Sequence, residues 1–252
     1  MQPAGAAVTR ASRVGSRRGA DRCRTTSSEV RLGHQGPLRR ETAGASPVVR
    51  RVEVDAGRLP RWVDGFVERH GATTWTPRDH GLLLTAVDGE QALMEPMCPR
   101  GEVPSGPAEL ATWAEPPDRT GLVLVRRGGY AVGVAAGDRL TASKVGTRYV
   151  QSRTAAGGWS QQRYARRRVN QAGELVATVV GHTLRLVLPS SPEHLVLGGD
   201  RNLVREVLAD PRLAALASVP ARELYDLPDP RLSVLEQALR RARAVRITLH
   251  RG

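Results

Sequence analysis

Residues 152–168, which read SRTAAGGWSQQRYARRR, carry the groups in this chain best suited to chemistry on a bound substrate. A pair of glycines and the four residues after them form the centre of this stretch: Gly157, Gly158, Trp159, Ser160, Gln161 and Gln162. The stretch contains no His, Cys, Asp or Glu, so it has no side chain able to act as a general base near neutral pH. A glutamine carboxamide both donates and accepts hydrogen bonds. A reaction here would depend on amides, backbone N–H groups and groups of the substrate.

The same stretch belongs to a strongly basic window. Seven basic residues and no acidic one lie between positions 144 and 168: Lys144, Arg148, Arg153, Arg163, Arg166, Arg167 and Arg168. Phosphate contacts by Arg and Lys dominate nucleic-acid affinity, so RNA is the partner that this window favours. A solvated, charged helix face is the alternative.

These residues resemble the Gly-Gly-Gln catalytic domain of eukaryotic and archaeal class I release factors. Those factors share a Gly-Gly-Gln hinge, then a Ser, then an Arg-aromatic-Ala-Arg helix start. The equivalents here are Gly157-Gly158, Ser160 and the run Arg163-Tyr164-Ala165-Arg166. The chain is more similar still to the Vms-like release factor family, in its actinobacterial branch, where a Gly-Gly…Ser-Gln variant replaces Gly-Gly-Gln. Upstream Gly146-Thr147-Arg148-Tyr149 adds to the match, which extends thinly over residues 50–250.

The resemblance implies hydrolysis of the ester between a nascent peptide and its tRNA, on stalled large ribosomal subunits. Gln161 takes the place of the catalytic glutamine, and Gln162 is its rival because Trp159 separates the glycines from Ser160. The implied partners are the large subunit with its rRNA and peptidyl-tRNA; no cofactor or metal is implied. The window's basic residues and Gln162 would contact RNA. Trp159 would stack on an unpaired base or pack against its own domain.

Two other functions stay open at this point. Eukaryotic relatives in the family are associated with cutting near the tRNA 3′ end, which makes a tRNA endonuclease one alternative. A non-catalytic rRNA- or tRNA-binding module is the other, as in release-factor paralogues that have lost the Gly-Gly-Gln. Stop-codon reading is not expected, because about 200 residues beyond the N-terminal segment leave space for one domain.

Composition divides the 252 residues unequally, with a formal net charge of +13. Residues 1–48 are rich in Arg, Gly, Ser and Ala and poor in large apolar residues, which predicts a disordered basic tail. Cys23 and Cys98 make neither a disulfide framework nor a zinc site. Without a signal sequence or an apolar run long enough to span a membrane, the protein is expected to be cytoplasmic, away from membranes and monomeric.

Residues 49–252 are expected to form one release-factor-like domain of the α/β class, a single mixed sheet flanked by helices. Hydrophobic periodicity predicts helices near 59–70, 108–113, 160–188, 200–208 and 230–242. Strands are predicted near 49–55, 72–77, 81–87, 121–127, 130–135, 139–151, 194–198, 222–227 and 245–250. Asp200 is expected to cap a helix, and the six histidines to be surface or capping residues.

Overall fold

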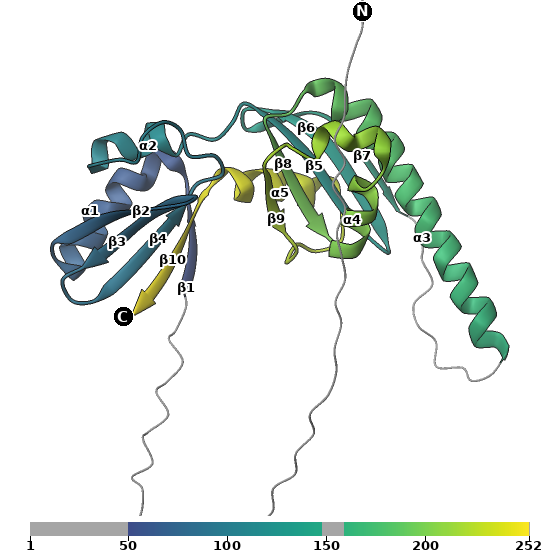
Figure 1. Ribbon diagram of the computed structural model, residues 1–252, viewed down its shortest axis with the longest axis horizontal. Coiled ribbons are helices and arrows are strands. Elements are labelled where there is room, and N and C mark those ends of the chain that lie inside the picture. The colour runs from purple at the N-terminus through teal and green to yellow at the C-terminus, as the bar shows by residue number, and fades with distance from the viewer. Residues whose placement is uncertain (1–49, 148–158, 252) are drawn as a thin grey trace, which may run out of the picture. The chain divides into compact units, whose positions relative to one another are not determined.

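The computed structural model describes residues 50–147 and 159–251, with side chains for all of these except 159–170. The described residues form two five-stranded sheets with helices packed against them (Figure 1). The predicted tail at 1–48 lies outside these ranges, as do residues 148–158. None of the described helices combines the length and apolarity needed to cross a bilayer.

Sheet A is entirely antiparallel, in the order β1-β10-β4-β3-β2. Its strands are β1 (Arg50–Val54), β2 (Thr73–Arg78), β3 (Gly81–Ala86), β4 (Glu90–Glu95) and β10 (Val245–Arg251). The helix α1 (Leu59–His70) buries Leu59, Val63 and Phe66 against it, and α2 (Leu110–Trp113) adds Leu110 and Trp113 to the same core. Leu82, Leu84 and Met94 complete this core from the sheet.

Sheet B is mixed, in the order β7-β6-β5-β8-β9. Its strands are β5 (Arg119–Arg126), β6 (Gly129–Ala136), β7 (Arg139–Thr147), β8 (His194–Gly199) and β9 (Ala221–Leu224). The pairs β5–β8 and β8–β9 are parallel, whereas β5–β6 and β6–β7 are antiparallel. The parallel pairs need crossover connections, which α3 (Trp159–Leu186) and α4 (Arg201–Leu208) supply.

Alternation along β5 explains why sheet B carries helices on both faces. Val123 and Val125 point to the core beneath α3 and α4, and Leu122 and Leu124 point to the core beneath α5 (Leu232–Arg243). Because successive strand residues face opposite sides, a continuous apolar run gives a strand buried on both faces.

The predicted α/β class, with a mixed sheet flanked by helices, is confirmed. The structure differs from the predicted single sheet, because its strands are divided between two sheets, of which only sheet B is mixed. The short turns between β2, β3 and β4 allow only antiparallel pairing, since a parallel pair needs a long crossover. Strand β4 was not predicted; the Asp88-Gly89 turn that starts it is closed by a hydrogen bond from Glu90 N to Asp88 Oδ1 (3.0 Å).

Candidate nucleic-acid interface

In the sequence, the predicted site runs from β7 into the first turns of α3. Lys144 is exposed on β7, one of the two edge strands of sheet B. Gly157, Gly158, Arg148 and Arg153 lie outside the described residues. The other predicted residues occupy the first turns of α3, where the structure describes the backbone but not the side chains: Trp159, Ser160, Gln161, Gln162, Arg163, Arg166, Arg167 and Arg168.

The second half of α3 is anchored to sheet B by an apolar stripe. Leu175, Val179 and Val180 are buried, and Ala172 and Val176 pack against the same core. Ala172, Val176, Val179 and Thr183 recur at spacings of four and three, as expected of one side of a helix. Thr183 is fully buried and donates to Val179 O (2.9 Å). The helix ends at Leu186, shortly before Pro189, as the sequence predicts. The packed second half of α3 therefore continues, as one helix, into the turns that carry predicted site residues (Figure 1).

A polar contact adds to this anchor at the end of β7. Tyr130 Oη lies 2.9 Å from His182 Nε2, and the two rings stack with centroids 5.2 Å apart. Arg185 donates to His182 Nδ1 (2.9 Å), which assigns the proton to Nε2. Burial, followed by the charges of Arg185 and Lys144, lowers the pKa of His182. The imidazole is therefore held in its neutral form as a structural bridge from α3 to β6.

Gly146 completes this contact from β7. A Cβ at this position would lie 2.5 to 2.6 Å from three atoms of the Tyr130 side chain. Only glycine leaves room for the tyrosine, so β7, β6 and α3 are packed together through Gly146, Tyr130 and His182.

The described side chains of α3 place any general base of this helix far from Gln161. At 1.5 Å per residue, Glu174 lies about 20 Å and His182 about 31 Å further along the helix axis. Neither distance allows proton transfer to a substrate held at Gln161. Within the part of the chain that the structure describes, no three His, Cys, Asp or Glu side chains are grouped to hold a metal ion.

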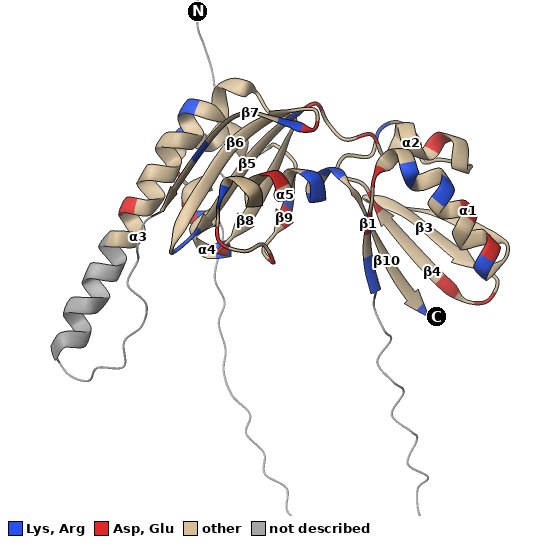
Figure 2. Cartoon of the chain, turned by 180° about the vertical axis from the view of Figure 1, so that it is seen from behind, with Lys and Arg blue, Asp and Glu red and all other residues tan. Residues whose placement is uncertain are grey.

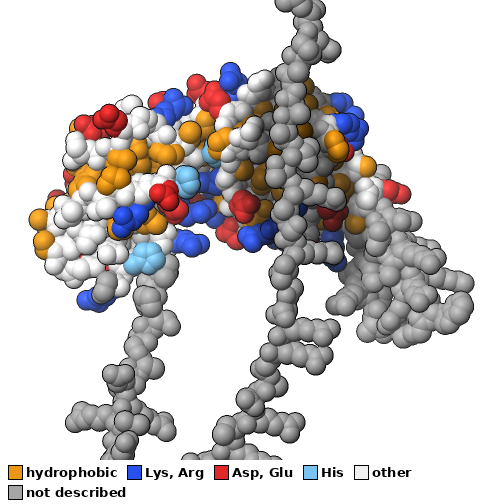
Figure 3. Space-filling model, viewed as in Figure 1, with side chains coloured by type: hydrophobic (Ala, Val, Ile, Leu, Met, Phe, Trp, Pro, Cys, Tyr) orange, Lys and Arg blue, Asp and Glu red, His pale blue; other side chains and the backbone are white. Residues whose placement is uncertain are grey.

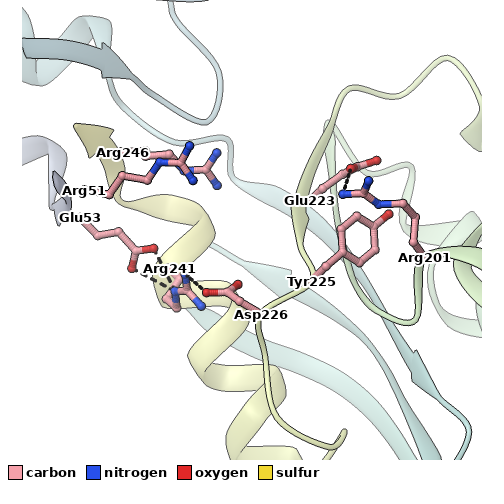
Figure 4. Close-up of a pocket in the computed structure, with 8 residues that line it drawn as sticks. All are labelled: Arg51, Glu53, Arg201, Glu223, Tyr225, Asp226, Arg241 and Arg246. Atoms are coloured by element: carbon pink, nitrogen blue, oxygen red, sulfur yellow. Dashed lines mark hydrogen bonds and ion pairs between the residues drawn. The ribbon is translucent and has the colours of Figure 1, made fainter. Parts of the chain in front are cut away.

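A polar pocket of about 710 Å³ lies beside β1, β9 and β10 and is shown in Figure 4. Arg241 binds Glu53 (2.9 Å) and Asp226 (2.9 Å), while Arg201 lies near Glu223 (3.9 Å) and 4.5 Å from the centre of the Tyr225 ring. Four arginines face three carboxylates in this pocket, so most of its charge is compensated internally. The pocket is better explained as a polar contact between elements than as a site for an anion.

Three histidines, which were expected to be surface or capping residues, have surroundings that the sequence did not predict. His194 is 4% exposed in β8, so its interpretation as a surface or capping residue was wrong. His70 Nδ1 is paired with Asp88 Oδ2 (2.9 Å), a partner that sequence proximity did not reveal. His182 is the bridge to Tyr130. Asp200 does cap α4, accepting from Asn202 N and Leu203 N.

The chain is matched by a family of release factors. The model of the family described as Actinobacteria/chloroflexi VLRF1 release factor matches residues 118–248. This match spans more than half of the chain, and the protein belongs to that family. The matched range includes all of sheet B, α3 and the Gly-Gly…Ser-Gln segment, whereas β1 to β4 and α1 precede it.

A solved structure titled Vms1 mitochondrial localization core aligns at 10% identity over 74% of this chain and 80% of that chain, with a TM-score of 0.37. No curated protein matches the chain.

Proposed function

We propose that residues 49–252 act as a peptidyl-tRNA hydrolase that frees nascent peptides from tRNA on stalled large ribosomal subunits. The observation that carries this proposal is that the release-factor family match at 118–248 includes the segment 152–168. The protein is a member of a release factor family, and ester hydrolysis on the ribosome is the reaction that this membership favours.

Gln161 is proposed as the residue that positions the attacking water and donates to the oxyanion. Its carboxamide can do both, but it cannot accept a proton as a base near neutral pH. The terminal ribose hydroxyl of the tRNA and the surrounding rRNA would then move the proton. The distances of Glu174 and His182 along α3 support this division of labour, because the described part of that helix offers no base within reach.

The glycines and the basic residues have separate roles in the proposal. Gly157 and Gly158, without Cβ atoms, allow the backbone to enter a narrow RNA-lined cavity, and Ser160 belongs to the same motif. Arg163 and Arg167 are one helical turn apart and Arg166 adjoins them, so one helix side would carry several phosphate contacts. Lys144, exposed on β7, would extend this surface with Arg148, Arg153 and Arg168.

Gln161→Ala provides the test. On purified large subunits carrying peptidyl-tRNA, the rate of peptide release should fall by about 10²–10³, because one preorganised donor is lost. Cosedimentation with the subunits should stay unchanged, since no phosphate contact is removed. Gln162→Ala is the matched control and should retain most of the activity; a loss confined to Gln162→Ala would move the catalytic role to that residue.

The same reaction separates hydrolysis from tRNA cutting. Ester hydrolysis leaves an intact CCA end, whereas an endonuclease leaves a shortened tRNA, so the 3′ ends of the released tRNA should be full length. Shortened ends would favour the endonuclease alternative. Unaltered release by both glutamine variants would refute the proposed mechanism.

A further inference from the structure

A basic cavity lies on sheet A, against α1 and the paired strands β1 and β10. It has a volume of about 680 Å³, and its arginines come from α1 and from the ends of the two strands: Arg50, Arg61, Arg69 and Arg251. Val52, Phe66 and Leu249 give it an apolar floor. We call this cavity the α1 pocket. Figure 2 shows the basic segments of α1 and of the start of β1.

The charge of the α1 pocket is not compensated by its own residues. All four arginines are exposed, and none has an ion pair within the ranges that the structure describes. Glu90 is the one carboxylate among the lining residues. In the pocket of Figure 4, by contrast, four arginines are opposed by three carboxylates. The α1 pocket therefore has the electrostatics expected of an anion site.

An aromatic column gives the pocket a flat, fixed wall. Trp62 is half-buried and stacks on Phe66 with ring centroids 5.5 Å apart and an interplanar angle of 14°. Phe66 in turn lies 4.7 Å from the His70 ring, which Asp88 holds at 2.9 Å. Arginines around an ordered aromatic are the usual means of binding unpaired RNA, where phosphates pair with guanidinium groups and a base stacks on the ring.

The sequence of α1 leaves space for such a ligand. Arg61, Gly65 and Arg69 follow one another at intervals of four, so the glycine lies between the two arginines on one side of the helix. A Cβ at Gly65 would meet nothing within 4 Å. Glycine in a helix costs about 0.5–1 kcal/mol relative to alanine, yet no close contact in the fold demands it here.

We propose that the α1 pocket binds the sugar-phosphate backbone of single-stranded RNA, with an unpaired base against Trp62. All of its lining residues lie outside the family match at 118–248. The site is therefore a second RNA contact, separate from the window 144–168 and beyond the proposed peptidyl-tRNA hydrolase function.

The test measures the affinity of the full chain for a fluorescent single-stranded RNA of about twelve nucleotides over a range of salt concentrations. Replacing Arg61 and Arg69 with Gln should weaken binding and reduce the slope of log affinity against log salt by about 1.4, or 0.7 for each lost phosphate contact. The matched control replaces Arg58 and Arg78 with Gln; both are exposed on the same part of the chain, and neither lines the pocket. The control should leave the slope unchanged.

A pair of variants at Gly65 tests the pocket without removing an arginine. Gly65→Glu should weaken RNA binding several-fold more than the equal-sized Gly65→Gln, because only the glutamate adds a negative charge between Arg61 and Arg69.

Equal slopes for the Arg61/Arg69 and Arg58/Arg78 variants, or equal affinities for the two Gly65 variants, would overturn the proposal. Displacement of the RNA by adenosine monophosphate or inorganic phosphate at the same concentration would also overturn it, in favour of a small phosphate ligand. Peptide release plays no part in these measurements, so failure of the hydrolase proposal would leave their outcome unaffected.

Discussion

At the scale of single residues, sheet B buries two polar side chains, His194 and Thr120. Burial, followed by the charge of Arg222, lowers the pKa of His194 to about 4. His194 Nδ1 has no hydrogen-bond partner among the described residues, and neither does Thr120 Oγ1, which lies opposite it in the β5–β8 register. These groups occupy the core without the hydrogen bonds that usually accompany burial.

His194 should make the stability of the fold depend on pH. Its pKa is lower in the folded chain than the ordinary value of 6.5, so the unfolded chain binds the proton more readily. Stability is thus fully present above pH 6.5 and is lost as the pH falls towards 4, by up to about 3 kcal/mol. Urea unfolding at pH 7.5 and pH 5 measures the difference. His194→Leu should markedly reduce this difference in the free energy of unfolding between the two pH values. An equal pH dependence in the variant would assign the effect to other groups.

At the scale of elements, α3 connects the folded core to the predicted site. Its later turns are fixed by the apolar stripe and by the Tyr130–His182 contact, while its first turns carry Gln161 and the arginines. The orientation of the predicted site therefore depends on how firmly β6 and β7 hold the far part of the same helix.

Gly146→Ala tests this dependence. The new Cβ would displace Tyr130 from its position against His182, which should lower the free energy of unfolding by about 1–3 kcal/mol, as overpacking does. Thermal unfolding measures the loss. Gly128→Ala in the adjacent turn is the control, because a Cβ there meets nothing within 4 Å. Comparable destabilisation by both variants would show that the Tyr130 contact is not the cause.

Most elements could be predicted from hydrophobic period and from turn residues. The stripe on α3, the Gly128-Gly129 hairpin and the Asp200 cap are all local patterns, and the structure has all three. The division into two sheets could not be predicted, because it depends on β10 pairing with β1 and β4, which are far away in sequence. The same holds for the α1 pocket, whose arginines come from opposite ends of the described chain. The proposed catalytic segment came from motif and resemblance, and its residues remain predictions.

At the scale of the whole molecule, Arg222 links the two sheets. It is 9% exposed on β9 and donates to Ala242 O (3.1 Å), Ala244 O (2.7 Å) and, from sheet B across to sheet A, Glu95 O (2.7 Å). Burial, with the charge of Arg246, lowers its pKa to about 10, which still leaves it charged at neutral pH. One buried cation thus joins β9, the end of α5 and the end of β4.

Arg222→Met should be among the most destabilising changes in the chain. It would leave three carbonyl groups without their donor, at a cost of about 3 kcal/mol or more in the free energy of unfolding. Hydrogen exchange measured at increasing denaturant concentration should show the backbone amides of sheet A losing protection before those of sheet B. Arg243→Met removes a single bond, to Pro117 O (3.0 Å), and should cost far less. Equal losses in the two variants would contradict the linking role of Arg222.

The position of β10 has a consequence for the order in which the protein folds. Sheet B and its helices are built from one continuous stretch, Arg119 to Arg243, whereas sheet A needs β10 to fill the gap between β1 and β4. Before β10 arrives, β1 has no partner and β4 has an open edge, and open edges invite association with other chains. Closing that gap requires residues 95 and 246 to meet, and a folded sheet B shortens the free loop between them. We therefore expect sheet B to form first and to act as the template on which sheet A closes.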